Sequence, residues 1–264
     1  MVSRLKSLVL VSALLLSACS GLTASAPQSR TLMVFAAASL TDAFTHIGQA
    51  FEAQHPGVAV VFNFAGSQAL RTQLEQGAVA DVFASASGKE MTAAIDAGLI
   101  VSGAQKNFLT NQLIVILPTD NPASVQTLED LAKPGLKLVL AAEEVPVGGY
   151  AREALGKLET SFGAGFKDRV LTNVVSNEDS VKQVVTKVGL GEADAGIVYG
   201  SDAVAAPELP TLAIPAEFNV IATYPMAPLS NAPEAELAAE FIAHVLSAEG
   251  QAALKQWGFT PITP

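Results

Sequence analysis

The chain has 264 residues, of which 50% are hydrophobic and 15% are charged. This composition excludes a disordered chain, and the length allows one large domain or two smaller ones. The formal net charge of −10 at pH 7 argues against a nucleic acid as the partner of the folded body.

The first residues have the pattern of an export signal. Arg4 and Lys6 form a short basic region, and small residues follow the apolar run 8–16. This run is too short to span a bilayer by itself. We therefore expect the folded part of the chain to lie outside the cytoplasm.

A single cysteine, Cys19, stands at the end of this signal. The motif Leu16-Ser17-Ala18-Cys19 resembles the lipobox of bacterial lipoproteins, in which the cysteine is lipidated and becomes the mature N-terminus. We expect residues 1–18 to be a lipoprotein-type signal peptide and Cys19 to carry a lipid anchor, so that the protein is periplasmic or on the cell surface. The alternative is cleavage after Ala26, which gives a soluble secreted protein.

Residues 19–30 contain mainly small and polar residues, and they are typical of a tether between an anchor and a folded body. Without Arg4 and Lys6, 13 basic residues stand against 25 acidic ones, a net charge of −12. If such a chain binds an anion, we expect oriented dipoles, and not a basic patch, to hold it.

The first part of the body alternates between strand and helix patterns. The predicted strands are short apolar runs, and the predicted helices have apolar residues three or four positions apart. The strands are expected at 32–37, 58–64 and 82–84, and the helices at 40–51, 70–74 and 91–97. A new strand is expected to begin at Asn111.

The same alternation continues to the end of the chain. Strands are predicted at 113–117, 136–141, 170–175 and 196–199. Helices are predicted at 127–132, 150–158, from 176–180 through Val188, from Pro233, and around Leu254 and Trp257. Alternating strands and helices imply parallel sheets with helices on their faces, which is the α/β fold class.

The grouping of these elements predicts two lobes, each a sheet flanked by helices. Residues 31–110 and 223–264 are expected to form lobe 1, and residues 111–222 are expected to form lobe 2. The chain would cross between the lobes near residue 111 and again near residues 223–225. Ligands of open α/β sheets bind outside the carboxyl ends of the strands, so the site is expected in the cleft between the lobes.

Four junctions between a predicted strand and a predicted helix share one character: each has small or hydroxyl residues at the start of the helix. They are Ala38-Ser39, Gly66-Ser67, Pro146-Val147-Gly148-Gly149 and Asp179-Ser180. The first N–H groups of a helix have no partner within it, and its dipole is positive at that end. Four such ends facing one cleft predict an anion site.

Several segments in the same order resemble the periplasmic molybdate-binding proteins of ABC transporters. They are Phe35-Ala36-Ala37-Ala38-Ser39-Leu40-Thr41, Phe64-Ala65-Gly66-Ser67, Val145-Pro146-Val147-Gly148-Gly149-Tyr150-Ala151, Gly196-Ile197-Val198-Tyr199-Gly200-Ser201-Asp202-Ala203 and Gly258-Phe259-Thr260. The resemblance implies a two-lobed type II periplasmic binding-protein fold that closes on molybdate or tungstate. It also implies an ABC transporter permease as partner, a monomer, and no cofactor.

The resemblance places the ligand contacts on five positions. Ser39 and Ser67 would bind oxyanion oxygens through their hydroxyl and N–H groups, Val147 and Ser180 through their backbone N–H groups, and Tyr199 through its phenol. Val147 replaces a smaller alanine of the common family pattern, and Ser180 replaces an apolar residue. A serine at position 180 is also typical of a simple helix N-cap, without a role in binding.

The predicted ligand is a tetrahedral oxyanion. The five positions offer donors only, which argues against phosphate, because monoprotonated phosphate also needs an acceptor. Sulfate has the same charge and shape as molybdate, so a receptor for sulfate or another tetrahedral oxyanion is the alternative.

An enzyme of another class is the remaining alternative, and a secreted serine hydrolase would use Ser39 or Ser67 as nucleophile. Asp42 and His46 lie on the same predicted helix as Ser39, a geometry that does not easily form a relay. The sequence contains no cluster with zinc-site spacing and no complete dinucleotide or phosphate-loop motif. We therefore expect a binding protein and no catalysis.

Overall fold

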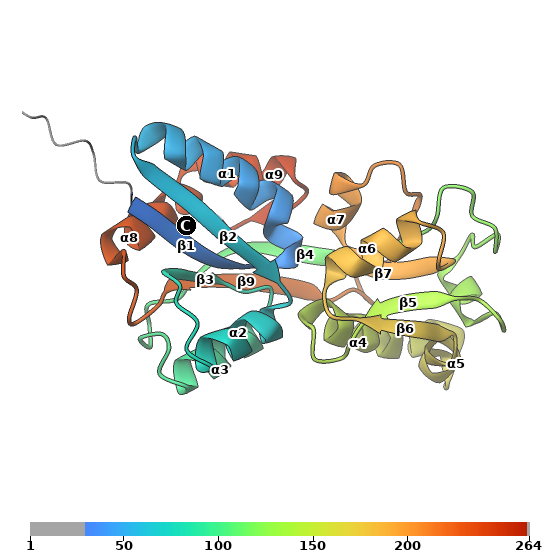
Figure 1. Ribbon diagram of the computed structural model, residues 1–264. Helices are drawn as coiled ribbons and strands as arrows, with labels where there is room; N and C mark the ends of the chain where they lie inside the picture. The colour runs from blue at the N-terminus through green and yellow to red at the C-terminus, as the bar shows by residue number, and fades with distance from the viewer. Residues whose placement is uncertain (1–29, 263–264) are drawn as a thin grey trace, which may run out of the picture.

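Two β-sheets that share one long strand organise the protein. The computed structural model describes residues 30–262, so the predicted signal peptide, most of the tether and Cys19 lie outside the described residues. Eight strands follow one another in the order β2-β1-β3-β9-β4-β7-β5-β6, and β8 and β10 pair with β4 beside this path. Each sheet is the centre of one lobe (Figure 1).

The first lobe is built on a sheet with a parallel part and an antiparallel part. β1 (Arg30–Ala37) lies between β2 (Val58–Ala65) and β3 (Val82–Ala84) in parallel, and β9 (Ile221–Pro228) joins β3 in antiparallel. The helices α1 (Thr41–Gln54), α8 (Ala235–Leu246) and α9 (Ala248–Gln256) lie on one side of the sheet, and α2 (Ser67–Glu75) and α3 (Gly88–Asp96) lie on the other (Figure 1). The alternation predicted from sequence is confirmed for this lobe.

The second lobe repeats the plan with fewer strands. β5 (Leu138–Ala141) pairs in parallel with β6 (Val174–Glu178) and with β7 (Ala195–Tyr199), while β8 (Thr211–Ala213) pairs with β4 in antiparallel. The helices α6 (Val181–Gly189) and α7 (Gly200–Ala205) lie on one side, and α4 (Pro146–Phe162) and α5 (Phe166–Thr172) lie on the other (Figure 1). The remaining elements are η1 (Ala38–Leu40), η2 (Leu128–Ala132) and β10 (Thr260–Pro261).

The long strand β4 (Lys106–Ile116) belongs to both sheets. Residues 106–112 pair with β9 in the first sheet, and residues 113–116 pair with β7 in the second. β4 and β9 therefore connect the lobes, as the predicted crossings near residue 111 and residues 223–225 require. The lobe boundaries given above remain a prediction.

Each lobe has apolar side chains on both faces of its sheet. In the first lobe, Phe44 and Phe51 of α1 pack edge-on against Phe241 of α8, with ring centroids 5.9 and 5.4 Å apart. In the second lobe, Val184 and Val188 of α6 are fully buried. The apolar spacing predicted from sequence thus fixes the helix faces that cover each sheet. Among residues 30–262, no helix combines the length and the apolar character that a membrane crossing needs.

Two element predictions in the second lobe are wrong. Residues 170–172 end helix α5, although the sequence predicts a strand at 170–175, and residues 176–178 belong to strand β6, although the sequence predicts the start of a helix there. Phe166 and Val170, four positions apart, are both fully buried and give α5 its apolar face. A short apolar run does not distinguish a helix end from a strand, and here it contains parts of both.

Two other differences concern length and omission. β4 begins at Lys106, five residues before the predicted start at Asn111, because its first half pairs with β9 and its register shifts between Asn107 and Leu109. The short helix α7 after Tyr199 and the strands β8 and β10 were not predicted from sequence, and β9 was predicted only as a crossing near residues 223–225.

Candidate functional site

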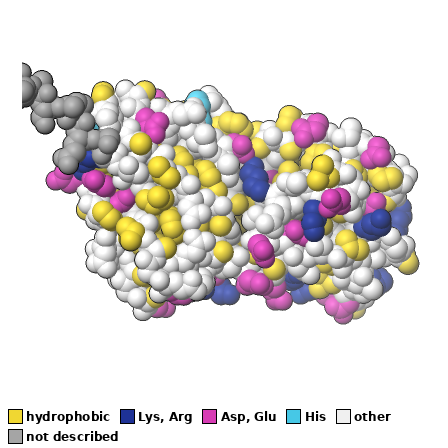
Figure 2. Space-filling view, in the orientation of Figure 1, with side chains coloured by type: hydrophobic (Ala, Val, Ile, Leu, Met, Phe, Trp, Pro, Cys, Tyr) yellow, Lys and Arg dark blue, Asp and Glu magenta, His cyan; other side chains and the backbone are white. Residues whose placement is uncertain are grey.

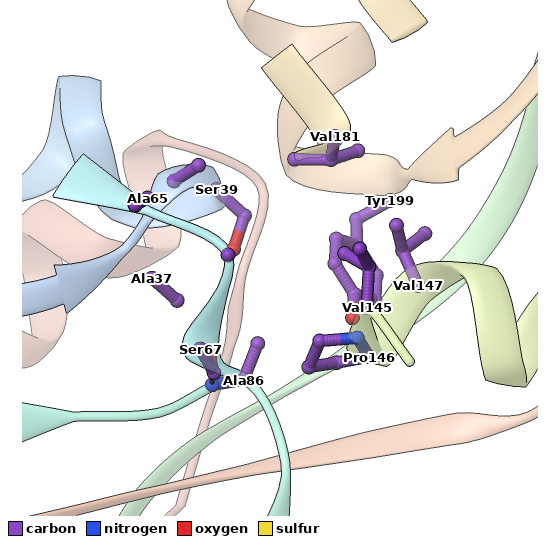
Figure 3. A pocket seen from close by; sticks show the side chains of 12 residues that line it. Ala37, Ser39, Ala65, Ser67, Ala86, Val145, Pro146, Val147, Val181 and Tyr199 are labelled. Carbon is purple, nitrogen blue, oxygen red and sulfur yellow. Dashed lines mark hydrogen bonds between the residues drawn. The ribbon is translucent and has the colours of Figure 1, made fainter. Parts of the chain in front are cut away.

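A small cavity lies between the lobes at the starts of four helices. Twelve residues line it: Ala37, Ala38, Ser39, Ala65, Gly66, Ser67, Ala86, Val145, Pro146, Val147, Val181 and Tyr199. Figure 3 shows Ser39 and Ser67 on one side, facing Val147, Val181 and Tyr199 on the other. The structure thus brings together four of the five positions predicted from sequence.

Ser39 enters the cavity from the turn between β1 and α1. It lies within η1, is almost completely buried, and its Oγ is 2.9 Å from the Oη of Tyr224 on β9. When the Tyr224 phenol donates this hydrogen bond, the hydroxyl proton of Ser39 remains available for a ligand. Burial raises the pKa of Tyr224, which keeps its phenol protonated.

Ser67 is the first residue of α2, so its backbone N–H has no acceptor within the helix. The backbone N–H of Ala86 donates to the Oγ of Ser67 at 3.0 Å. This bond uses a lone pair of Oγ and leaves its proton free to donate. Ser67 therefore presents a donor to the cavity, and Ser39 does so when Tyr224 donates to it.

The second lobe contributes the start of α4. Pro146 occupies the first helical turn, where its missing N–H costs no helical hydrogen bond, and Val147 follows it. Gly148 packs so closely on the end of β5 that a Cβ there would clash with the carbonyl oxygens of Ala141 and Ala142. The glycine therefore sets how closely the start of α4 approaches the end of the strand.

The start of α6 contains Ser180, which the sequence predicts as a helix cap and as a ligand contact, and Val181 directly after it. Ser180 is the N-cap of α6, in an extended conformation, and it is not among the residues that line the cavity. Val181, the first helical residue, lines the cavity, and its N–H has no acceptor within the helix. The cavity lining therefore includes Val181, one residue after the predicted contact Ser180.

Tyr199 ends β7 and has the clearest sign of an unmet hydrogen bond. Its side chain is 1% exposed, and its Oη is one of four buried side-chain polar atoms without a hydrogen-bond partner among residues 30–262. Burial is the main cause that raises the pKa of Tyr199 well above its ordinary value, so the phenol keeps its proton. A buried phenol without a partner costs free energy, which a ligand oxygen at this position would recover.

The lining of the cavity is neutral. No Lys, Arg, His, Asp or Glu is among its twelve residues, and the polar groups are hydroxyls and the N–H groups of helix starts. The cavity volume is about 10 Å³, which is room for about one water molecule. The cavity therefore excludes drug-sized organic ligands, whose sites measure about 300 Å³ or more, and it has to widen to admit a tetrahedral oxyanion. This arrangement can hold a small anion by oriented dipoles.

The hydrolase alternative requires a general base beside Ser39 or Ser67. The hydrogen bonds recorded for the Ser39 and Ser67 hydroxyls within the described chain go to Tyr224 and to the Ala86 N–H, and neither is a general base. His55 lies against Phe51, with ring centroids 3.9 Å apart, outside the cavity lining. Over the same range, no cluster of His, Cys, Asp and Glu side chains could hold a metal ion.

Residues 32–260 match the family of bacterial extracellular solute-binding proteins. The chain belongs to this family. The molybdate-binding protein ModA of Mycobacterium tuberculosis is 42% identical to this solute-binding protein over 232 residues, which cover 88% of this chain and 85% of the relative. This family binds solutes and is not a family of enzymes.

Two solved structures resemble the solute-binding protein. The substrate-binding domain of a putative molybdenum ABC transporter from Clostridium difficile has a TM-score of 0.66 and 30% identity, covering 89% of this chain and 100% of that one. The sulfate-binding protein SubI from Mycobacterium tuberculosis has a TM-score of 0.78 at 17% identity, covering 89% and 88%. This second likeness shows the fold alone, and it confirms the two-lobed binding-protein architecture.

The structure also adds residues that sequence analysis missed. Ala86, Val145 and Val181 line the cavity, and Tyr224 contacts Ser39 from outside it. Val181 carries a sequence signal, because it is the first apolar residue after a capping serine. Tyr224 carries none, because its contact joins residues 185 positions apart.

Proposed function

We propose that the protein captures molybdate outside the cytoplasm for import by an ABC transporter. The observation that carries the proposal is one small, neutral cavity at which both lobes present hydroxyls and helix starts. Donors of this kind suit a compact anion with acceptor oxygens on every side. The family and the name of the Mycobacterium tuberculosis relative support molybdate as the cargo.

The chemistry of the donors favours a fully deprotonated tetrahedral dianion. The two serine hydroxyls and the Tyr199 phenol all have a proton to donate, and the lining has no carboxylate that could accept a proton from phosphate. Tungstate has the same charge and shape as molybdate, and we propose that it binds as well. Sulfate differs in size, so the fit of the closed cavity is expected to separate it from molybdate.

Calorimetric titration of the purified protein with molybdate, tungstate, sulfate and phosphate tests this proposal. We expect tight binding of molybdate and tungstate, much weaker binding of sulfate, and none of phosphate. Tight sulfate binding with micromolar or weaker molybdate binding would instead establish a sulfate receptor.

The proposal includes no chemical step. The lobes close on the anion because the closed form offers it contacts from both sides, and the closed form is what the permease would recognise. The protein is expected to act as a monomer without a cofactor. Turnover of ester substrates that is lost in Ser39→Ala would support the hydrolase alternative, and we expect no turnover.

We further propose that Cys19 anchors the protein by lipidation. The support is the lipobox-like motif and the position of the only cysteine after an apolar run. Labelling with radioactive palmitate in a bacterial host is expected for the wild-type chain and not for Cys19→Ala. Equal labelling of both proteins would contradict the anchor and favour cleavage after Ala26.

A further inference from the structure

One lysine beside the cavity contacts both lobes. The Nζ of Lys182, on α6 of the second lobe, is 2.6 Å from the Oδ2 of Asp42, on α1 of the first lobe, and 3.5 Å from the Oδ1 of Asp202 on α7. The other ion pairs recorded among residues 30–262 each lie within one lobe. Figure 2 shows acidic and basic side chains together where the lobes meet.

We propose that the Lys182–Asp42 ion pair sets the affinity for the oxyanion by stabilising the closed arrangement of the lobes, without touching the anion. The inference rests on the proposed function and deepens it. Lys182 follows the cavity residue Val181, and Asp42 lies three positions after the cavity residue Ser39. The start of α6 also packs on η1, so the ion pair and the closed cavity require the same approach of the two lobes.

Asp202 holds the ammonium group of Lys182 in a position from which it can contact Asp42. The Asp202 side chain is fully buried within the second lobe, and its Oδ1 has no hydrogen-bond partner in the described chain. A buried carboxylate needs a nearby cation, so it keeps the Lys182 ammonium group close in the open and the closed arrangement alike. Closure then adds Asp42 as a partner without ordering a free lysine, which lowers the entropic cost of the contact.

The sequence assigns Asp42 only to the favourable charge at a helix start, and the ion pair adds a second role. Charge repulsion and ion pairing predict opposite effects of Asp42 on ligand affinity. Asp42 is a negative charge near the site of a dianion, so simple repulsion predicts tighter binding when the charge is removed. An ion pair that stabilises closure predicts weaker binding.

The test is calorimetric titration with molybdate of the wild-type chain, Asp42→Asn, Lys182→Met and the double variant. We expect each single variant to raise the Kd by about three- to tenfold, and the double variant to add little to Lys182→Met, because Asp42 has already lost its partner in that variant. Glu178→Gln is the matched control, since Glu178 pairs with Lys187 of the same helix α6 within one lobe, at 2.7 Å. Its Kd should equal that of the wild-type chain.

A structural defect would give a different pattern. Thermal unfolding without ligand should be nearly equal for the wild-type chain and Asp42→Asn, and Asp42→Glu should restore most of the affinity. An unchanged or lower Kd in Asp42→Asn, or strictly additive effects in the double variant, would overturn the inference alone. If the wild-type chain binds none of the oxyanions, the proposed function and this inference fail together.

Discussion

The Tyr199 phenol shows how a single residue carries information about a ligand. Its Oη is buried at the cavity and lacks a partner within the described chain, while Tyr224 nearby has its Oη bonded to Ser39. The two rings lie 5.8 Å apart, centroid to centroid. Tyr199 therefore lines the cavity with an unsatisfied hydroxyl, whereas Tyr224 lies behind the lining and bonds Ser39.

Tyr199→Phe is expected to weaken molybdate binding without weakening the fold. A hydrogen bond to a charged acceptor contributes about 1.5 to 3 kcal/mol, so the Kd should rise by about 10- to 150-fold. The melting temperature of the ligand-free protein should stay the same or rise, because the lost hydroxyl had no partner. Calorimetry and thermal unfolding measure both effects.

Tyr224→Phe is the control for this prediction. It removes a phenol whose Oη bonds Ser39 and does not line the cavity. We expect a smaller rise in the Kd and a lower melting temperature than for Tyr199→Phe. Wild-type affinity in Tyr199→Phe would show that its phenol does not contact the anion.

The contribution of Asp202 to the stability of the protein is expected to depend on pH. Burial raises its pKa to about 6, against the favourable charge of Lys182 and the hydrogen bond from the Tyr199 N–H. The folded protein therefore holds a proton on Asp202 more tightly than the unfolded chain does. The contribution of Asp202 to the free energy of unfolding should thus be largest below about pH 4 and fall, by about 3 kcal/mol at most, as pH rises to about 6.

Urea unfolding of the wild-type chain and Asp202→Asn between pH 4 and pH 7 measures this contribution. The free energy of unfolding of the wild-type chain, relative to that of Asp202→Asn, should fall as the pH rises from about 4 to about 6. Asp202→Asn should lack this part of the pH dependence. Parallel curves over the whole range would show that Asp202 ionises in the same way in the folded and unfolded chains.

At the scale of elements, the first turns of the helices form most of the candidate site. α2, α4 and α6 each place their first turn at the cavity, and η1 does so before α1. Their N–H groups are fixed by the backbone, so the site tolerates changes of side chain such as Val147 for alanine. A substitution that removes one of these N–H groups is expected to weaken binding.

Val181→Pro removes the first N–H of α6 and is expected to weaken molybdate binding by about tenfold or more. Proline suits this position, because it is the first helical residue and Ser180 before it is extended, at φ −155° and ψ 160°. Val181→Ala is the matched control, since it shortens the side chain and keeps the N–H. Calorimetry should show near wild-type affinity for Val181→Ala, and equal losses in both variants would assign the effect to packing.

Sequence patterns predicted most elements, because apolar periodicity and small residues at junctions are local signals. The helix of Ala43, Phe44 and Ile47 and the strand at 82–84 are observed as predicted. The strand at 170–175 was wrong because burial of Val170 has the same signature in a helix and in a strand. The Tyr224–Ser39 and Lys182–Asp42 contacts were not predictable from local patterns, because each joins residues at least 140 positions apart.

For the whole molecule, closure and stability are linked through the ligand. Under the proposed function the anion binds the folded, closed protein and not the unfolded chain, so we expect it to raise the melting temperature with the logarithm of its concentration. Molybdate at 100 times its Kd should add about 2.7 kcal/mol to the free energy of unfolding.

Thermal unfolding with molybdate, and with phosphate as the control anion, checks this expectation. Small-angle scattering of the same samples should show a smaller radius of gyration with molybdate, because the lobes close. A melting temperature raised equally by phosphate would indicate general binding of anions and no selective cavity.

Because β4 is shared between the two sheets, the second lobe is a single insertion into the first. The chain leaves the first sheet after Gln112 and returns at Ile221, and these two residues are register partners on neighbouring strands. Everything between them is thus inserted into the first lobe through one pair of adjacent positions. A graft of the corresponding segment from another solute-binding protein has to match this pairing and the contacts that residues 113–220 make with the rest of the chain. These include the α6–η1 contact, the Lys182–Asp42 ion pair and the Asn111–Ser201 hydrogen bond. A graft that meets these conditions gives a chimeric receptor with a new second wall of the cavity.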